Sequence, residues 1–370
     1  MSPKDHFRKF TVKLLEKYFA VTPLSDGSLD TPKKILIVRQ HNQFGDLLAS
    51  VSLFRAVKES IPDAHLTLVA SPENYFAVIN NKFIDELIVF DRKKIFYPGY
   101  FIRFKKELQA NYDLAIVPTT VAISMTSCLL AAFSKARIKI GPVSLNGKRN
   151  DLDYLFNYRV NLDWRKCPDA HVSDFILDIV RPFGIKTKNY SSSISFDEKD
   201  EAFVNEFIDA IFPKEYDLLM GFHIGAGKEQ NRWSLDKYID LIERINSKHK
   251  IKFYFTGSEA DSEELNYVKK HFGSRGGYFL NNTIPQLAAL IAKSNLFITN
   301  DTGVMHVAGT TKTPQISIFG PTNPFNWAPV GHQKYFLRKS ELIDDVTVDD
   351  VENLFEIIFK KQSSLNEKSS

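Results

Sequence analysis

Short apolar runs alternate with longer amphipathic segments through the first half of the chain. Residues 33–40 read KKILIVRQ, a continuous apolar run that predicts a central strand of a parallel sheet. Leu47, Val51, Phe54 and Val57 then recur at helical spacing. Further strands are predicted at residues 64–71, 84–91, 113–117 and 136–141. Strands separated by helices indicate a doubly wound α/β domain.

A second series of the same kind begins near Asp217. It predicts strands at residues 218–225, 251–258, 296–300 and 315–320, with helices at 234–247 and 284–294 between them. The predicted fold class is therefore α/β, with two Rossmann-like domains facing across a cleft. Ligands usually bind at the carboxyl ends of such sheets.

These patterns divide the chain into five parts. The polar residues 362–370 predict a disordered end. The predicted parts are an N-terminal extension with an amphipathic helix (1–32), a first Rossmann-like domain (33–185), a linker (186–216), a second Rossmann-like domain (217–345), and a C-terminal helix with a disordered tail (346–370).

One uncharged run, from Leu114 to Phe133, is long enough to span a bilayer. Pro118 and a cluster of Thr and Ser residues divide it. The run therefore predicts a buried strand, a polar turn and a buried helix ending near Ser134, in preference to a transmembrane helix.

The composition is that of a soluble globular protein, and the net charge of +4 is too small to argue for a nucleic-acid partner. Cys128 and Cys167 are the only cysteines, which favours a reducing cytoplasm over a disulfide framework. The nine histidines show no zinc-ligand spacing, so no metal site is predicted. The N-terminal residues lack the apolar core of a signal peptide.

A glycine-rich turn lies between a predicted strand and a predicted helix, in the sequence LLMGFHIGAGKEQNRWS. It is not a P-loop, because Phe222 stands where the first glycine belongs and Glu229 where the hydroxyl belongs. It is not the dinucleotide fingerprint either, because Gln230 replaces the third glycine. The pattern leaves open what this turn holds.

A strand ending at Asn300 leads through Asp301, Thr302 and Gly303 directly into a predicted helix. The free N–H groups at a helix start favour an anion, and Gly303 lets a phosphate approach the backbone closely. His306 lies one turn further on. The alternative is that Asp301 only caps the helix and His306 only packs.

Several segments occur in an order that resembles a known family. They are ILIVRQHNQFGDLLASVSLFRAVKESIPDAHLTLV, FHIGAG with RWSLDKYIDLI, FTGSEADSEE, and NDTGVMHVAG with TPQISIFGPTNPFNWAPVG. Together they resemble glycosyltransferase family 9, the ADP-heptose:lipopolysaccharide heptosyltransferases, from about Lys33 to Arg338. The resemblance implies a GT-B fold and inverting, metal-independent transfer without a cofactor. It also implies a nucleotide-diphosphate sugar as donor, ADP-heptose, and a lipopolysaccharide core or related glycan as acceptor.

The resemblance places the donor in the second domain. The turn at Gly225, Ala226 and Gly227 would face the same pyrophosphate as Asp301, Thr302, Gly303 and His306. The family commonly has a lysine at the position of Asn231, so Lys228 or Arg232 would supply the positive charge instead. His223 matches a strand-end histidine that is either donor-binding or structural. Glu259 matches an acid that contacts the ribose, and its alternative is a solvated acid at a helix start.

The resemblance makes Asp46 the general base. An ordinary aspartate has a pKa of about 3.9, so it is ionised at neutral pH and can accept a proton as C1 of the donor becomes cation-like. The alternative is a helix-capping aspartate. Asp151 and Asp153 spell the D-x-D of metal-dependent transferases, but without a second supporting motif they predict a surface turn.

The acceptor side is expected in the first domain, at Gly45, Arg92, Lys93 and Lys94. Residues 91–109 mix basic and aromatic side chains that suit anionic sugars or lipid phosphates. The alternative is an amphipathic helix that packs Phe101, Phe104 and Leu108 into the core.

The N-terminal extension presents a similar choice. One helical stripe carries Phe7, Phe10, Leu14 and Tyr18 beside several lysines, which fits either a membrane-surface anchor or a helix docked on the domain. The expected location is the cytoplasm, with peripheral contact at the inner face of the inner membrane.

Two further functions remain alternatives to glycosyl transfer. GT-B folds also host nucleotide-sugar epimerases and hydrolases, which would release product without an acceptor. A catalytically degenerate sugar-nucleotide-binding protein would bind the donor without turnover. An NAD-dependent oxidoreductase is disfavoured by Gln230.

Overall fold

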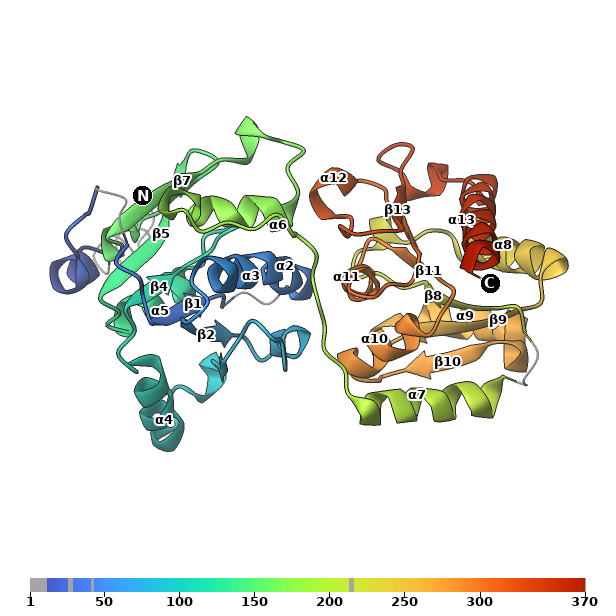
Figure 1. The fold of residues 1–370 in the computed structure, drawn as a ribbon, viewed down its shortest axis with the longest axis horizontal. Helices are drawn as coiled ribbons and strands as arrows, with labels where there is room; N and C mark the ends of the chain where they lie inside the picture. Colours follow the sequence, from blue (N-terminus) through green and yellow to red (C-terminus); the bar gives the residue numbers. More distant parts are fainter. Residues whose placement is uncertain (1–11, 26–28, 41–42, 213–215, 370) are drawn as a thin grey trace. The chain divides into compact units, whose positions relative to one another are not determined.

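The computed structural model describes residues 12–25, 29–40, 43–212 and 216–369, with side chains described up to Lys361. The chain divides into two compact units, Met1–Tyr190 and Ser191–Ser370 (Figure 1). Each unit is built on its own largely parallel sheet.

The sheet of the first unit has the strand order β3-β2-β1-β4-β5-β6, with β7 also paired to β5. All the pairs are parallel except β5 with β6. The strands are β1 (Lys34–Val38), β2 (His65–Ala70), β3 (Glu86–Val89), β4 (Leu114–Ile116), β5 (Ile138–Leu145), β6 (Lys148–Arg149) and β7 (Tyr158–Leu162). The five predicted strands are confirmed, whereas β6 and β7 were not predicted.

Helices cover both faces of this sheet (Figure 1). They are α2 (Phe44–Ala49), α3 (Val51–Ser60), α4 (Pro98–Leu108), α5 (Met125–Phe133) and α6 (Val172–Phe175). The predicted helical stripe of Leu47, Val51, Phe54 and Val57 is fully buried. This is the expected outcome for apolar side chains repeated every three or four residues.

The sheet of the second unit is wholly parallel, in the order β10-β9-β8-β11-β12-β13. Its strands are β8 (Leu218–His223), β9 (Ile251–Gly257), β10 (Gly277–Leu280), β11 (Leu296–Asn300), β12 (Gln315–Ile318) and β13 (Lys334–Leu337). Every residue of β8 is buried, as a central parallel strand requires. The four predicted strands are confirmed, and β10 and β13 at the two edges are additional.

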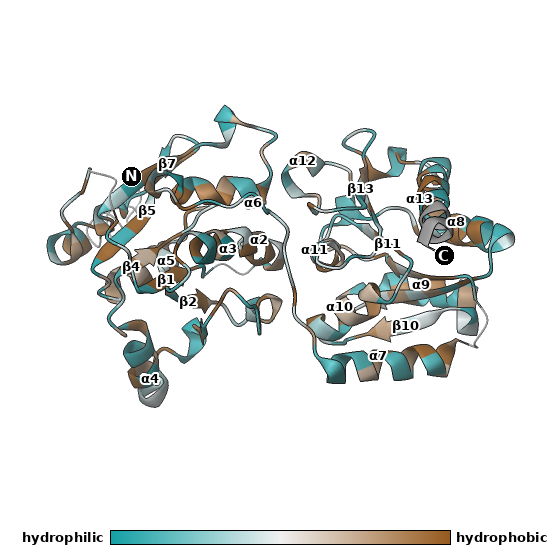
Figure 2. Ribbon diagram, viewed as in Figure 1, coloured by the Kyte–Doolittle hydropathy of each residue, from teal (hydrophilic) through white to brown (hydrophobic). Residues whose placement is uncertain are grey.

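The helices of the second unit are α7 (Glu198–Ile211), α8 (Leu235–Lys248), α9 (Ser262–Phe272), α10 (Ile284–Ala292), α11 (Gly303–Gly309), α12 (Pro324–Trp327) and α13 (Val348–Ser369). Helix α7 starts at a capping box made by Asp197 and Asp200. Its hydrophobic and hydrophilic residues alternate around the axis, as Figure 2 shows.

Two expectations about the chain's connections need correction. The range predicted as a linker, 186–216, contains α7, because its apolar side chains, including Val204, pack onto the second unit. The predicted disordered tail is instead the end of α13, which continues to Ser369. No glycine or proline interrupts residues 348–369, so nothing in this stretch breaks a helix.

The described part of the N-terminal extension contains a helix at residues 12–19. Val12, Leu15 and Phe19 pack against the core of the first unit, and the Phe19 and Phe133 rings lie 5.1 Å apart. Leu14 and Tyr18, on the predicted stripe, are exposed, while Phe7 and Phe10 lie outside the described residues. The docked face is therefore not the predicted stripe.

The apolar run from Leu114 to Phe133 forms β4, a turn and α5, as predicted. The Ser124 side chain caps α5 by accepting a hydrogen bond from the Ser127 N–H. Among the described residues, no helix combines the length and the apolar character that a membrane span needs.

Candidate functional site

The glycine-rich turn follows the carboxyl end of β8. Gly225 is buried, and a Cβ atom at this position would overlap the Asp261 carboxylate. That carboxylate cannot easily withdraw, because it accepts hydrogen bonds from the N–H and hydroxyl of Ser258. Gly227 is exposed, with open space where a Cβ would be. The two glycines therefore have different roles, one in packing and one facing solvent.

Asn300, at the end of β11, holds this turn in place. Its side-chain amide donates to the carbonyls of Ile224 (2.8 Å) and Gly225 (3.3 Å). Its side-chain oxygen accepts from the Trp233 N–H (3.2 Å) and the Tyr238 hydroxyl (2.9 Å). Asn300 is fully buried, so these bonds are made away from water. One side chain thus joins β8, β11 and the start of α8.

Asp301 is held next to the same turn by Asn231. The Asn231 amide donates to the Asp301 carbonyl (3.2 Å) and carboxylate (3.1 Å). Burial raises the pKa of the Asp301 carboxyl group, while a hydrogen bond from Thr322 and the charge of Lys228 oppose that rise. Asn231, which stands where the resembled family commonly has lysine, therefore serves here as a neutral link between the two loops.

The two candidate cations are placed differently. Arg232 forms an ion pair with Glu264, and its Nε donates to the Ala226 carbonyl (2.9 Å). Its charge is therefore already compensated, and its role is to brace the turn. Lys228 is exposed and lies close enough to Asp301 to influence its pKa. Of the two, Lys228 is the cation available to an anionic ligand.

The loop after β11 enters α11 with Thr302 as the residue before its first turn. Asp301 is therefore not the capping residue, and the Thr302 side chain makes no cap hydrogen bond. Thr302, Gly303 and His306 are all partly exposed. The His306 ring lies edge-on to Trp327, with centroids 6.5 Å apart.

His223 and Glu259 differ in their surroundings. His223 is buried, with Nδ1 3.1 Å from the Thr256 carbonyl and 3.0 Å from its hydroxyl. Burial lowers the His223 pKa, with the Asp261 charge opposing this. Glu259 is exposed just beyond the carboxyl end of β9, where its N–H donates to Asn281 (3.1 Å).

In the first unit, Asp46 lies in the first turn of α2 and is only 2% exposed. The Thr120 hydroxyl is 3.3 Å from one carboxylate oxygen, and Arg39 approaches the same oxygen at 3.8 Å. Arg39 also donates to Thr120 (2.7 Å), and burial lowers its pKa while Asp46 opposes that shift. Gln43 is the cap position of α2, so Asp46 is not a helix-capping residue.

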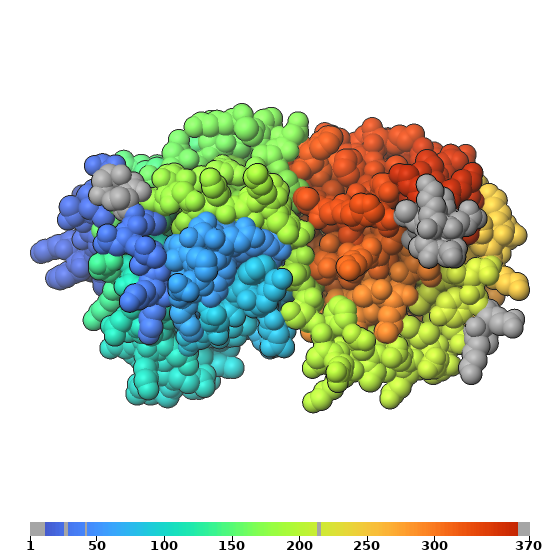
Figure 3. Space-filling model, in the orientation of Figure 1, coloured from blue at the N-terminus to red at the C-terminus, as the bar shows by residue number. Residues whose placement is uncertain are grey.

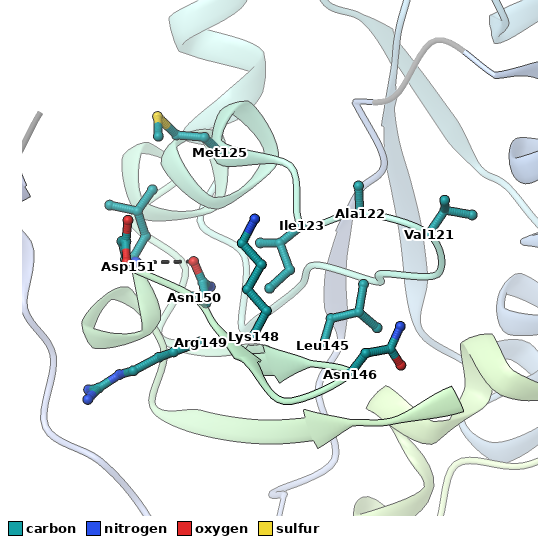
Figure 4. Close-up of a pocket in the computed structure, with 11 residues that line it drawn as sticks. Val121, Ala122, Ile123, Met125, Leu145, Asn146, Lys148, Arg149, Asn150 and Asp151 are labelled. Atoms are coloured by element: carbon teal, nitrogen blue, oxygen red, sulfur yellow. Dashed lines mark hydrogen bonds between the residues drawn. The ribbon is translucent and has the colours of Figure 1, made fainter. Parts of the chain in front are cut away.

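A pocket of about 410 Å³ lies next to this cluster in the same unit (Figure 4). Val121, which directly follows Thr120, is at its edge, and the Lys148 side chain extends towards Ile123 and Met125. The pocket thus combines an apolar wall with two basic residues, Lys148 and Arg149. It is lined by Val121, Ala122, Ile123, Met125, Leu145, Asn146, Lys148, Arg149, Asn150, Asp151 and Leu152.

The D-x-D sequence beside this pocket is split by the fold. Asp151 is exposed, whereas Asp153 is 4% exposed and pairs with Arg149 at 3.0 Å. The expected surface turn is thus only half correct, because Asp153 is buried. Within the described ranges, no group of three His, Cys, Asp or Glu side chains is placed to hold a metal ion. Cys128 and Cys167 are both free thiols.

The predicted acceptor residues lie at the carboxyl edge of the first sheet. Gly45 precedes Asp46 in α2, and Arg92, Lys93 and Lys94 form an exposed 3₁₀ turn just beyond β3. In a parallel sheet β1 and β3 end at the same edge, two strand spacings or about 10 Å apart. The Gln40 side chain bridges them by donating to the Phe90 carbonyl (3.1 Å).

Sequence reasoning did not select Arg39, Thr120, Asn231 or Asn300 as site residues. Arg39 and Asn300 each stand at or just after the carboxyl end of a predicted strand, and this position could have marked them as site residues. Thr120 lies in a polar turn whose partners are more than seventy positions away, so local pattern could not pair it with Asp46.

Solved structures share this architecture of two parallel-sheet units. A glycosyl transferase of family 9 from Veillonella parvula aligns with a TM-score of 0.78 and 20% identity, covering 91% of this chain and all of that one. The Escherichia coli ADP-heptose lps heptosyltransferase II aligns with a TM-score of 0.71 and 20% identity, covering 89% of this chain and 99% of that one. The E. coli heptosyltransferase WaaC, solved with ADP, aligns with a TM-score of 0.66 and 16% identity, covering 88% of this chain and 99% of that one. The fold is therefore the GT-B fold of glycosyltransferases.

Sequence comparison identifies the family. The model of glycosyltransferase family 9 (heptosyltransferase) matches residues 101–351, so the chain belongs to that family and is a glycosyltransferase. The Lipopolysaccharide core heptosyltransferase OpsX of Haemophilus influenzae is 25% identical over 306 residues, 81% of this chain and 82% of that protein. Lipopolysaccharide heptosyltransferase 3 of E. coli K12 is also 25% identical, over 77% and 82%.

Proposed function

We propose that this glycosyltransferase moves heptose from ADP-heptose onto a lipopolysaccharide core or related glycan. The relatives named above are lipopolysaccharide heptosyltransferases, and one similar structure was solved with ADP. The observation that carries the donor side is the Asn300 network. It fixes the glycine turn beside Asp301, so that exposed Gly227 and Lys228 adjoin the start of α11.

On the donor side, each group has a distinct role in this proposal. The exposed backbone at Gly227 and the partly exposed backbone at Thr302–Gly303 donate N–H groups to the diphosphate, and Lys228 supplies the positive charge. Glu259 accepts hydrogen bonds from the ribose hydroxyls. His223 acts from behind the turn as a buried structural group, because its ring is hydrogen-bonded to Thr256. No cofactor or metal takes part.

Asp46 is the general base of the proposed reaction. The acceptor hydroxyl oxygen attacks C1 of the donor while the bond from C1 to the phosphate oxygen breaks, and ADP leaves with that electron pair. The hydroxyl proton passes to Asp46, and the configuration at C1 inverts. Proton acceptance of this kind contributes roughly 10²–10⁴-fold to the rate. Arg39 and Thr120 hold the carboxylate in one orientation, because the Thr120 hydroxyl donates to it and the Arg39 guanidinium lies beside it.

The acceptor occupies the carboxyl edge of the first unit. The pocket at Lys148 suits an amphiphilic sugar with an anionic substituent, because a cation there adjoins apolar side chains. Arg92, Lys93 and Lys94 provide further positive charge.

The decisive measurement is nucleotide release from ADP-, UDP- and GDP-sugars, with and without a lipopolysaccharide-core acceptor. We expect acceptor-dependent ADP release from ADP-heptose that survives a metal chelator. Asp46→Asn should lower the rate at least about a hundredfold. Asp240→Asn is the control, because Asp240 is also an aspartate paired with an arginine, Arg244 of α8, and this variant should retain activity.

The other outcomes identify the alternatives. Release that does not need an acceptor would identify a hydrolase or epimerase. Tight ADP-sugar binding without release would identify a degenerate binding protein. Full activity of Asp46→Asn would remove Asp46 from the mechanism.

A further inference from the structure

The segment around α4 exposes an unusual amount of apolar surface. Phe96 is 91% exposed, Ile102 67%, Tyr97 65% and Phe101 45%. Single exposed apolar residues are common, but four within seven positions form a patch of the kind that is typical of a binding surface. Figure 3 shows this part of the chain at the surface of the first unit.

The patch is held in place by neighbouring residues on the buried side of α4. Phe104 and Leu108 are each 4% exposed and anchor α4 in the core. The Tyr100 ring stacks on Phe104 (centroids 6.0 Å apart), and its hydroxyl accepts from the Asp91 N–H (2.6 Å) and lies 3.1 Å from the Val89 carbonyl. Ile102 is two positions from Phe104, a rotation of about 200° around the helix, and so points away from the core.

Basic residues surround the exposed apolar ones. Arg103, Lys105 and Lys106 are exposed on the same helix. Arg103 approaches Glu107 at 3.9 Å, whereas Lys105 and Lys106 form no ion pair within the part of the chain that the structure describes. We call the set Phe96, Tyr97, Phe101, Ile102, Arg103, Lys105 and Lys106 the α4 surface.

The composition of the α4 surface distinguishes between two kinds of partner. Protein–protein interfaces are depleted of lysine at their centre, because a desolvated ammonium group is costly. At a bilayer surface, aromatic rings lie at the headgroup level, and lysines attract anionic lipids while remaining hydrated. Exposed phenylalanine, tyrosine and isoleucine intermixed with lysine and arginine therefore match an anionic bilayer.

We propose that the α4 surface docks the protein onto an anionic phospholipid bilayer. Phe96 and Ile102 enter the boundary between headgroups and acyl chains, and Arg103, Lys105 and Lys106 contact lipid phosphates. This proposal is independent of the sugar donor, of the acceptor and of the proposed reaction, so each can be tested without the other.

Vesicle flotation of the full-length protein tests it, without any sugar nucleotide or glycolipid. Wild type should float with vesicles of phosphatidylcholine and phosphatidylglycerol, and less with phosphatidylcholine alone. Added salt should weaken the binding, because screening shortens the range of the lysine charges to below about 10 Å above 0.1 M. Phe96→Ser with Ile102→Ser should reduce binding at least about tenfold through lost apolar burial.

The charge variant Lys105→Glu with Lys106→Glu should lose binding to the anionic vesicles specifically. The controls are Ile357→Ser on α13, 52% exposed, and Lys312→Glu, both in the second unit. These should bind as wild type does, and all variants should keep the wild-type melting temperature. Absence of wild-type flotation, or binding by the Phe96 and Ile102 variant within about twofold of wild type, would overturn the proposal.

Discussion

At the scale of single residues, the functional side chains depend on buried polar partners that hold them in one orientation. Asn300 uses both ends of its amide, and Asn231 ties Asp301 to the glycine turn. Removing one partner of a buried hydrogen bond leaves the other group without a partner and shielded from water, which lowers the free energy of unfolding by about 1–3 kcal/mol. Such residues therefore affect the site without contacting a substrate.

The buried His223 side chain makes the free energy of unfolding depend on pH. Burial lowers its pKa in the folded protein, so as the pH falls below about 6.5 the unfolded chain takes up the proton first. The free energy of unfolding contributed by His223 is thus fully present at higher pH. It is lost as the pH falls from the unfolded pKa towards the folded one.

We expect urea unfolding at pH 7 and pH 5 to show this loss in wild type, at up to about 1.4 kcal/mol per pH unit for one group. His223→Asn should reduce the change in unfolding free energy per pH unit. His332→Asn, at an exposed position, should not change it. An unchanged slope in His223→Asn would show that His223 is not the titrating group.

At the scale of elements, the turn after β8 shows how two glycines of one loop can serve different purposes. The space beside Gly225 is filled by Asp261, which also caps the 3₁₀ turn before α9. The space beside Gly227 is open. The turn is shaped by packing at one end and left accessible at the other.

Gly225→Ala should therefore cost about 1–3 kcal/mol of unfolding free energy, because the added methyl group displaces a hydrogen-bonded carboxylate. Gly227→Ala should change stability by less than about 0.5 kcal/mol and weaken ADP binding instead. Chemical denaturation and calorimetric titration with ADP measure the two effects. Equal destabilisation by both variants would contradict this division of roles.

Whole-molecule behaviour follows from the two units having separate cores. One buried core cluster of the second unit draws on residues between Leu218 and Ile358, and one of the first unit draws on residues between Leu36 and Phe156. A chain with two cores need not unfold in one step. Trp164 lies in the first unit, while Trp233 and Trp327 lie in the second.

ADP should raise the melting temperature of the second unit selectively. At a hundred times its dissociation constant, a ligand stabilises its binding unit by about 2.7 kcal/mol. Trp164→Phe leaves fluorescence that reports the second unit, and Trp233→Phe with Trp327→Phe leaves a reporter for the first. A rise in melting temperature seen only with the first-unit reporter would show that ADP binds the first unit and would contradict the proposal.

The sequence by itself determined the α/β class, most strands and helices, and the family. These follow from apolar periodicity and from motifs that are contiguous in the chain, such as Asp301, Thr302 and Gly303. Edge strands β10 and β13 were missed because partly exposed short strands carry a weak apolar signal.

Only the tertiary structure decided which side chains act together. Arg39, Asp46 and Thr120 meet because parallel strands end at one edge, and Asn300 reaches Gly225 across β8 and β11. It also assigned Arg232 to Glu264, leaving Lys228 accessible, and left Phe96 and Ile102 uncovered. Contacts between distant positions and the exposure of individual side chains depend on packing, which a local pattern does not contain.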